Sequence, residues 1–162
     1  MKKFFKISSV ILVIGLIAVV AGCSLFNGVG RVVTGVINNS ATHTYPLVKA
    51  YIFPVSEEEA NNPTRTKPAN IIEEKKATDV GPGQTVQFTF ENSIVEGTRV
   101  KLYIGIKKRT SPTQNSLSAT NEYYRLETSF VIQEGVNSPE ITLPQNWDDV
   151  KITETSEYRW WQ

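Results

Sequence analysis

Hydrophobic and polar residues alternate with a period of two through much of the chain after residue 30. In segments 86–90, 100–107 and 124–132, every second residue is apolar or aromatic, except for a threonine at position 128. This alternation predicts half-buried antiparallel strands, because successive side chains on a strand point to opposite faces. We expect Phe88 and Leu102, on the apolar faces of the two clearest strands, to lie in the core.

Other segments predict strands by their β-branched content. Residues 31–37 and 47–53 read as the first two strands, and 141–143 and 150–153 as short later ones. Segment 71–77 carries four charges, so we expect an edge strand there, with a helical turn as the alternative. Seven or eight short strands separated by turn signals predict an all-β protein, a single antiparallel β-sandwich.

Segment 54–70 interrupts this pattern with acidic residues, asparagines and two prolines. Ser56 and Glu59 have the spacing of a capping box, which favours a single helical turn. Pro63 and Pro68 lack the backbone donor that a strand needs. We expect a mobile, solvated loop whose partial deletion leaves the fold intact, because loop-closure entropy varies slowly with length.

The N-terminus has the layout of a secretory signal. Lys2, Lys3 and Lys6 precede an almost unbroken apolar run at 10–21. The run is shorter than the roughly 20 apolar residues of a membrane-spanning helix, although flanking residues extend it. An uncleaved anchor and a plain signal peptide therefore remain as alternatives to the interpretation that follows.

The run ends in Val20-Ala21-Gly22-Cys23, which resembles the lipobox of bacterial lipoprotein signal peptides. The resemblance implies that Cys23 is acylated and that the chain is cut before it. Two or more acyl chains anchor a protein stably, at about 0.8 kcal/mol per buried methylene. We therefore expect a signal peptide at 1–22, a lipidated tether at 23–30 and a β-sandwich domain at 31–162. The domain is expected on the extracytoplasmic side of a membrane in a bacterial cell envelope.

Charge and cysteine content narrow the function further. The full chain has 17 basic and 16 acidic residues; loss of three signal-peptide lysines leaves 14 against 16, a net charge of −2. Nucleic-acid binding calls for a basic patch or stripe, so we expect no nucleic-acid partner. Cys23 is the only cysteine, so the mature chain has no internal disulfide.

Residues suited to catalysis are sparse. His43 stands alone in a polar segment, and Asp148 and Asp149 are neighbours that need not share a site. The basic run 107–109 is typical of the solvated end of a strand. The alternative is that it contacts anionic lipid headgroups. We therefore expect no enzyme activity, no metal and no cofactor.

Aromatic residues are the more interesting candidates, because their rings stack on sugars and anchor protein interfaces. Tyr103 and Tyr123 are expected on outward strand faces. The alternative is that the C-terminal rings pack against the end of the sandwich or lie in a tail. The candidate ligand-binding residues are Trp147, Tyr158, Trp160 and Trp161.

Short motifs along residues 30–143 resemble the prealbumin-like β-sandwiches, including the carboxypeptidase regulatory-like domain. The motifs are Pro46-Leu47-Val48-Lys49-Ala50, Ala77-Thr78-Asp79, Phe88-Thr89-Phe90, Gly97-Thr98 and Ile141-Thr142-Leu143. An immunoglobulin-like sandwich is the competing fold. One branch of this family, a hydroxyisourate hydrolase, ends in Tyr-Arg-Gly-Ser and uses several histidines. Here Trp160-Trp161 follow Tyr158-Arg159 and His43 is the sole histidine, so that activity is not implied.

The resemblance implies a non-catalytic accessory or protein-interaction module, presented by a membrane-anchored envelope lipoprotein. The alternative is a lipoprotein that binds a glycan or a small ligand through its aromatic residues.

Overall fold

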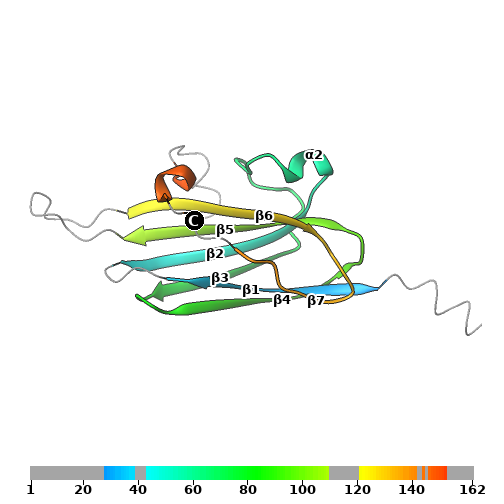
Figure 1. Ribbon diagram of the computed structural model, residues 1–162, viewed down its shortest axis with the longest axis horizontal. Helices are drawn as coiled ribbons and strands as arrows, with labels where there is room; N and C mark the ends of the chain where they lie inside the picture. The colour runs from blue at the N-terminus through cyan, green and yellow to red at the C-terminus, as the bar shows by residue number, and fades with distance from the viewer. Residues whose placement is uncertain (1–27, 39–42, 110–120, 142–143, 145, 153–162) are drawn as a thin grey trace, which may run out of the picture.

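A computed structural model describes residues 28–38, 43–109, 121–141, 144 and 146–152. These residues form seven strands and two short helical turns (Figure 1). In chain order the elements are β1 (Val29–Ile37), β2 (Thr44–Pro54), α2 (Glu57–Ala60), β3 (Glu73–Val80), β4 (Thr85–Val95), β5 (Arg99–Arg109), β6 (Asn121–Val131), β7 (Gly135–Asn137) and the 3₁₀ turn η1 (Trp147–Val150).

The strands form two sheets, with the orders β4-β1-β7 and β3-β2-β5-β6. Neighbouring strands are antiparallel, except that β7 runs parallel to β1. The predicted all-β sandwich is confirmed, with seven strands in the described part. In an immunoglobulin sandwich the first two strands share a sheet, whereas here β1 and β2 belong to different sheets.

The core lies between the sheets and is built from the alternating apolar positions. Val100, Leu102, Ile104 and Ile106 of β5 are completely buried, and Phe88 of β4 is 3% exposed. The predicted core positions of Phe88 and Leu102 are thus confirmed. Burying a side chain of this size stabilises the fold by about 1.5–3 kcal/mol.

A second apolar layer covers the outer face of the four-stranded sheet. Tyr51 of β2 lies directly opposite Tyr103 of β5, and their rings meet edge to face at 6.1 Å. Phe53 and Ile152 join them in one buried cluster. Tyr103 does point outward, as predicted, but its expected exposure is wrong, because neighbouring residues cover it completely.

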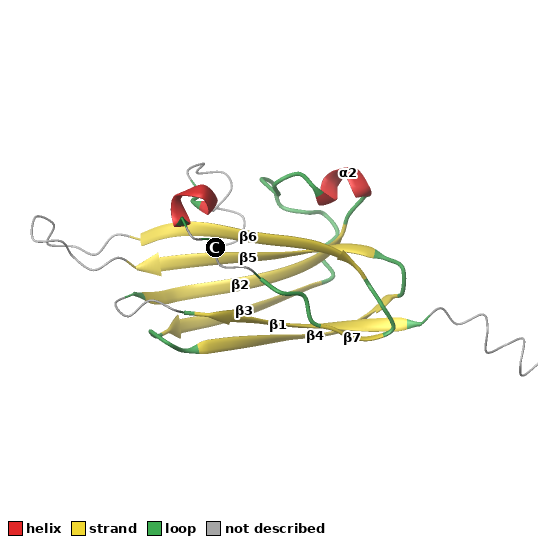
Figure 2. Cartoon of the chain, in the orientation of Figure 1, coloured by secondary structure: helices red, strands yellow, loops and turns green. Residues whose placement is uncertain are grey.

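Edge strand β3 is confirmed, whereas the C-terminal part departs from expectation. β7 is not predicted from the sequence. The strand predicted at 141–143 is wrong at Ile141, which lies outside any strand, and residues 142 and 143 lie outside the described residues. The described residues of the strand predicted at 150–153 form no regular strand: Val150 ends η1, and Lys151 forms an isolated β-bridge with Tyr124 of β6. Both helical turns lie on the β6 side of the molecule, away from β4 (Figure 2). In the part of the chain that is described, no helix has the length and apolar character to span a membrane.

Candidate functional site

The segment between β2 and β3 begins with the predicted helical turn. Ser56 is the N-cap of α2: its hydroxyl accepts from the backbone N–H of Glu59 at 3.2 Å. The Glu59 carboxylate accepts in return from the backbone N–H of Ser56 at 2.8 Å. This capping box is confirmed, and its hydrogen bonds hold the pKa of Glu59 below the usual value.

Lys101 of β5 fastens this segment to the sheet. Its side chain leaves the outer face of the sheet, yet the residue is only 2% exposed. The ammonium group donates to the backbone carbonyl of Glu59 at 2.8 Å and to that of Asn62 at 2.5 Å. One carbonyl group from α2 and one from just beyond it therefore converge on one buried cation.

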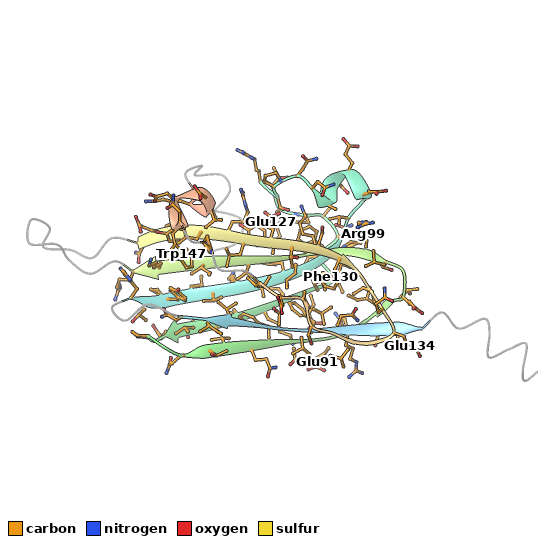
Figure 3. All side chains as sticks on the ribbon, viewed as in Figure 1. Glu91, Arg99, Glu127, Phe130, Glu134 and Trp147 are labelled. Atoms are coloured by element: carbon orange, nitrogen blue, oxygen red, sulfur yellow. The ribbon has the colours of Figure 1, made fainter. Side chains whose placement is uncertain are left out.

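Glu127 of β6 also binds this segment, and it forms an ion pair with Lys101. Its carboxylate lies 3.3 Å from the ammonium group of Lys101 and 3.0 Å from Nε of Arg125. The same carboxylate accepts from the backbone N–H of Thr64 at 2.9 Å and from the Thr64 hydroxyl at 3.2 Å. Figure 3 shows Glu127 on β6 beneath the segment that it holds.

These contacts correct the sequence-based expectation for residues 54–70. We expected a solvated loop independent of the fold, because its composition is polar. The structure shows that Lys101 and Glu127 bind polar groups at Glu59, Asn62 and Thr64. We call this arrangement, Lys101 and Glu127 with their partners in the segment, the ion-pair clasp.

A cleft of about 520 Å³ lies between the clasped segment and the sheet. This volume falls in the range of small-molecule sites, about 300–1,000 Å³. The cleft is lined by Phe53, Pro54, Val55, Glu59, Asn62, Pro63, Thr64, Arg65, Thr66, Lys67, Pro68, Ala69, Asn70 and Lys101.

The lining combines apolar walls with positive charge. Phe53, Val55 and the prolines supply apolar walls, while Arg65 and Lys67 are exposed and add positive charge. The Lys101 ammonium group has three donors and faces two carbonyls and one carboxylate, so these contacts fix the segment that forms one wall of the cleft. Across the described residues, no three His, Cys, Asp or Glu side chains are grouped to hold a metal ion.

Trp147, one of the four candidate aromatic residues, lies in a packed cluster away from the cleft. Its ring meets that of Tyr124 edge to face at 4.9 Å and is tilted against Tyr45 at 6.3 Å. The ammonium group of Lys108 lies 5.0 Å from the Trp147 ring centre, a cation–π distance. Figure 3 shows Trp147, the first residue of η1, beside the other half of β6 from Glu127.

The other candidate residues divide into two groups. Cys23, Tyr158, Trp160 and Trp161 lie outside the described residues. Among the residues considered for catalysis, Asp148 and Asp149 are exposed on η1, and the pKa of His43 is lowered by partial burial and by the positive charge of Lys108. None of these three residues lines the cleft.

Sequence reasoning missed the clasp because both of its charged residues occupy ordinary polar positions in alternating strands. One feature of the sequence does indicate that this sheet face is covered. Phe53 and Tyr103 fall on the same outward face as Lys101, and large aromatic residues on a sheet face indicate that another part of the chain covers it.

The fold and the cleft together define an all-β sandwich with a ligand-sized site on the outer face of its four-stranded sheet. Comparison with known proteins finds no matching family model, no matching curated protein and no matching solved structure.

Proposed function

We propose that this protein is a membrane-anchored lipoprotein of a bacterial cell envelope whose β-sandwich is a non-catalytic interaction module. The cleft beneath the clasped segment is its binding site. The observation that carries the binding role is this cleft of about 520 Å³ beneath a segment that the Lys101–Glu127 ion pair fastens to the sheet. The lipobox resemblance at Cys23 carries the anchoring role.

The position of the cleft supports the proposal that a binding partner can reach it. The cleft lies on the outer face of the four-stranded sheet, and its rim residues Arg65, Thr66 and Lys67 are exposed. Functional residues often lie on loops that a rigid scaffold positions. Here the scaffold is the β5–β6 pair, and the clasp fixes the loop upon it.

The strand order supports the resemblance to prealbumin-like sandwiches over the immunoglobulin-like alternative. β1 and β2 lie in different sheets, which an immunoglobulin domain does not allow. Membership of the prealbumin-like or carboxypeptidase regulatory-like class remains part of the proposal.

A Cys23→Ser change tests the anchoring role. The variant is expected to take up no labelled palmitate, to escape cleavage before residue 23 and to lose stable attachment through lipid. Ser24→Ala is the matched control and should mature normally. Palmitate still entering the Cys23→Ser protein would show that the anchor is misassigned.

Photocrosslinking in intact cells tests the binding role. A photoreactive amino acid at Thr66 lies in the cleft, whereas one at Gln87 lies on the exposed face of the other sheet. A partner captured from position 66 but not from 87, and lost when Ala69→Trp fills the cleft, is the expected result. Equal capture at both positions would place the interaction elsewhere.

Binding of a glycan or small ligand is the second candidate, and the cleft volume favours it. A ligand that binds the folded state raises the melting temperature by linkage. A rise with wild-type protein that disappears in Ala69→Trp is expected for a cleft ligand. If the rise persists in that variant, the ligand binds outside the cleft.

A further inference from the structure

The end of the sandwich next to the proposed anchor is fixed by backbone contacts. The carbonyl of Gly28, the first described residue, accepts from the N–H of Glu96 at 2.7 Å. Val29 then pairs with Val95 of β4, and Gly30 pairs with Gly135 of β7. This end therefore consists of the start of β1, the end of β4 and the start of β7.

Three valines are exposed there on the outer face of the three-stranded sheet. Val29 is 50% exposed, Val95 48% and Val136 70%. Val29 lies directly opposite Val95, and Val136 is paired with the outward-facing Arg31. The three side chains are neighbours on one sheet face and so form a small apolar surface, unlike apolar residues scattered singly, which need no explanation. We call Val29, Val95 and Val136 the valine patch.

The length of the tether determines what this patch can reach. Val29 follows Cys23 by six positions, and an extended chain of that length spans at most about 20 Å. Ile37, at the other end of β1, lies about 26 Å further along the strand at 3.3 Å per residue. If Cys23 carries lipid, the valine patch lies closer to the anchor than Ile37, the other large apolar residue that is exposed in the described part of the chain.

We infer that the valine patch contacts the lipid surface and orients the sandwich on the membrane. This inference rests on the lipid anchor of the proposed function. The contact is intramolecular once the anchor is inserted, so even a weak apolar attraction is populated at the high effective concentration that a short tether provides. The cleft would then be displayed from a sandwich with a defined orientation.

The charges near the patch do not form a basic surface, so apolar contact, and not attraction to anionic lipid, is the interaction that we assign. Arg31 is paired with Val136 on the same sheet face, but the side chains of Glu96 and Glu134 lie beside Gly28, and Figure 3 shows Glu134 close to the start of β1. The basic run 107–109 lies at the opposite end of the sandwich, where Arg109 pairs with Thr44. We therefore assign a zwitterionic lipid surface as the partner.

Depth-dependent quenching on the mature, full-length lipoprotein tests the inference. Val95→Cys and Val136→Cys are labelled with an environment-sensitive fluorophore, because acylation leaves no free thiol at Cys23. The proteins are reconstituted into phosphatidylcholine vesicles that contain a nitroxide-bearing lipid. The matched control is Ile37→Cys, which is 45% exposed on the same sheet face but at the far end of β1.

We expect at least twofold stronger quenching at positions 95 and 136 than at position 37. Equal quenching at all three positions, with the protein floating with the vesicles, would overturn the inference and leave the anchor intact. Quenching at 95 and 136 that appears only at high protein density would also overturn it, since it would indicate contact between copies. Labelling of Cys23 itself, together with failure to float, would instead refute the proposed anchor.

Discussion

The ammonium group of Lys101 lies 3.3 Å from the carboxylate of Glu127 on the adjacent strand, and both hold the same segment of chain. Breaking a buried ion pair by removing one partner is costly, because the other charge stays buried. We expect Lys101→Met to lower the free energy of unfolding by about 3 kcal/mol, measured by urea denaturation.

Lys76→Met is the matched control, since Lys76 is exposed on edge strand β3. It should change stability by less than about 0.5 kcal/mol. The double variant Lys101→Met/Glu127→Leu should recover part of the loss, because it removes both charges of the Lys101–Glu127 pair, although Arg125 also loses its ion pair with Glu127. Equal midpoints for Lys101→Met and Lys76→Met would contradict a stabilising clasp.

Deletion of residues 61–67 is expected to destabilise the fold. The deletion removes the Asn62 carbonyl and the Thr64 donors, which leaves Lys101 and Glu127 with buried charge and fewer hydrogen bonds. A loss of about 3 kcal/mol corresponds to a fall in melting temperature of roughly 10 °C for a domain of this size.

The same deletion in the Lys101→Met/Glu127→Leu background provides the control. In that background the deletion should lower the free energy of unfolding much less, because neither Lys101 nor Glu127 is present to lose its partners in the segment. Thermal denaturation of the four proteins completes a double-mutant cycle. A deletion that costs the same in both backgrounds would show that the segment stabilises the fold by some other contact.

Strands, core residues and the helix cap can be predicted from the sequence where one physical rule governs a whole segment. Period-two alternation located β4, β5 and β6 and identified Phe88 and Leu102 as core residues, because burial of one sheet face imposes that period. The capping box at Ser56 and Glu59 was predictable for a similar reason, since both halves of the motif lie within four residues.

Features that depend on contacts distant in sequence were not predictable. β7 is three residues long and has no alternation of its own, and it forms only because β1 offers an edge. The clasp joins Lys101 to residues about 40 positions earlier and to Glu127 on the next strand. The pattern of neighbouring residues cannot predict contacts between segments so far apart in the sequence.

Truncating the core residues tests the packing of the two sheets. Phe88→Ala should lower the free energy of unfolding by about 3–5 kcal/mol and Leu102→Ala by about 2–5 kcal/mol, through lost burial and the cavity left behind. Ile37→Ala is the control, because Ile37 is 45% exposed. Its cost should be below about 1 kcal/mol. Similar shifts in denaturant midpoint for all three would contradict the packing described.

The bridge between Glu122 and Lys151 predicts a specific pH dependence. Its atoms lie 2.6 Å apart, and hydrogen bonds from Lys151 and from the Tyr124 hydroxyl lower the pKa of Glu122. A lowered carboxyl pKa means that the stabilisation is present above the unfolded pKa, about 4.3, and is lost as the pH falls through the folded value. Glu122 in turn raises the pKa of Lys151, so that contribution is present below about 10.4 and is lost as the pH rises further.

Both side chains are about one-third exposed, so the bridge should contribute no more than about 1 kcal/mol. The stability difference between wild type and Glu122→Gln should therefore be small at pH 7 and should shrink at pH 3. Glu140→Gln, at an exposed position, is the control. A difference that grows on acidification would have the wrong sign for this pair.

The pairing of β1 with β7 depends on the absence of a side chain at Gly30. A Cβ atom there would lie 2.3 Å from the carbonyl oxygen of Gln133 and 2.6 Å from Cγ2 of Ile132, closer than atoms approach without displacement. Asn137 also crowds the position while it exchanges hydrogen bonds of 2.9 Å with the backbone of Gln133. We expect Gly30→Ala to cost about 1–3 kcal/mol by overpacking.

Gly35→Ala adds the same methyl group to the same strand, where the nearest atoms lie 3.8 Å away. It should be neutral, or stabilising by about 0.5–1 kcal/mol, because alanine loses less backbone entropy than glycine in a strand. Urea denaturation of the two variants, with hydrogen exchange at the Val136 amide, separates global from local effects. Gly30→Ala should weaken protection at Val136 and Gly35→Ala should not. Equal stability and equal protection in both variants would mean that β7 does not lie against Gly30, which would also remove Val136 from the valine patch.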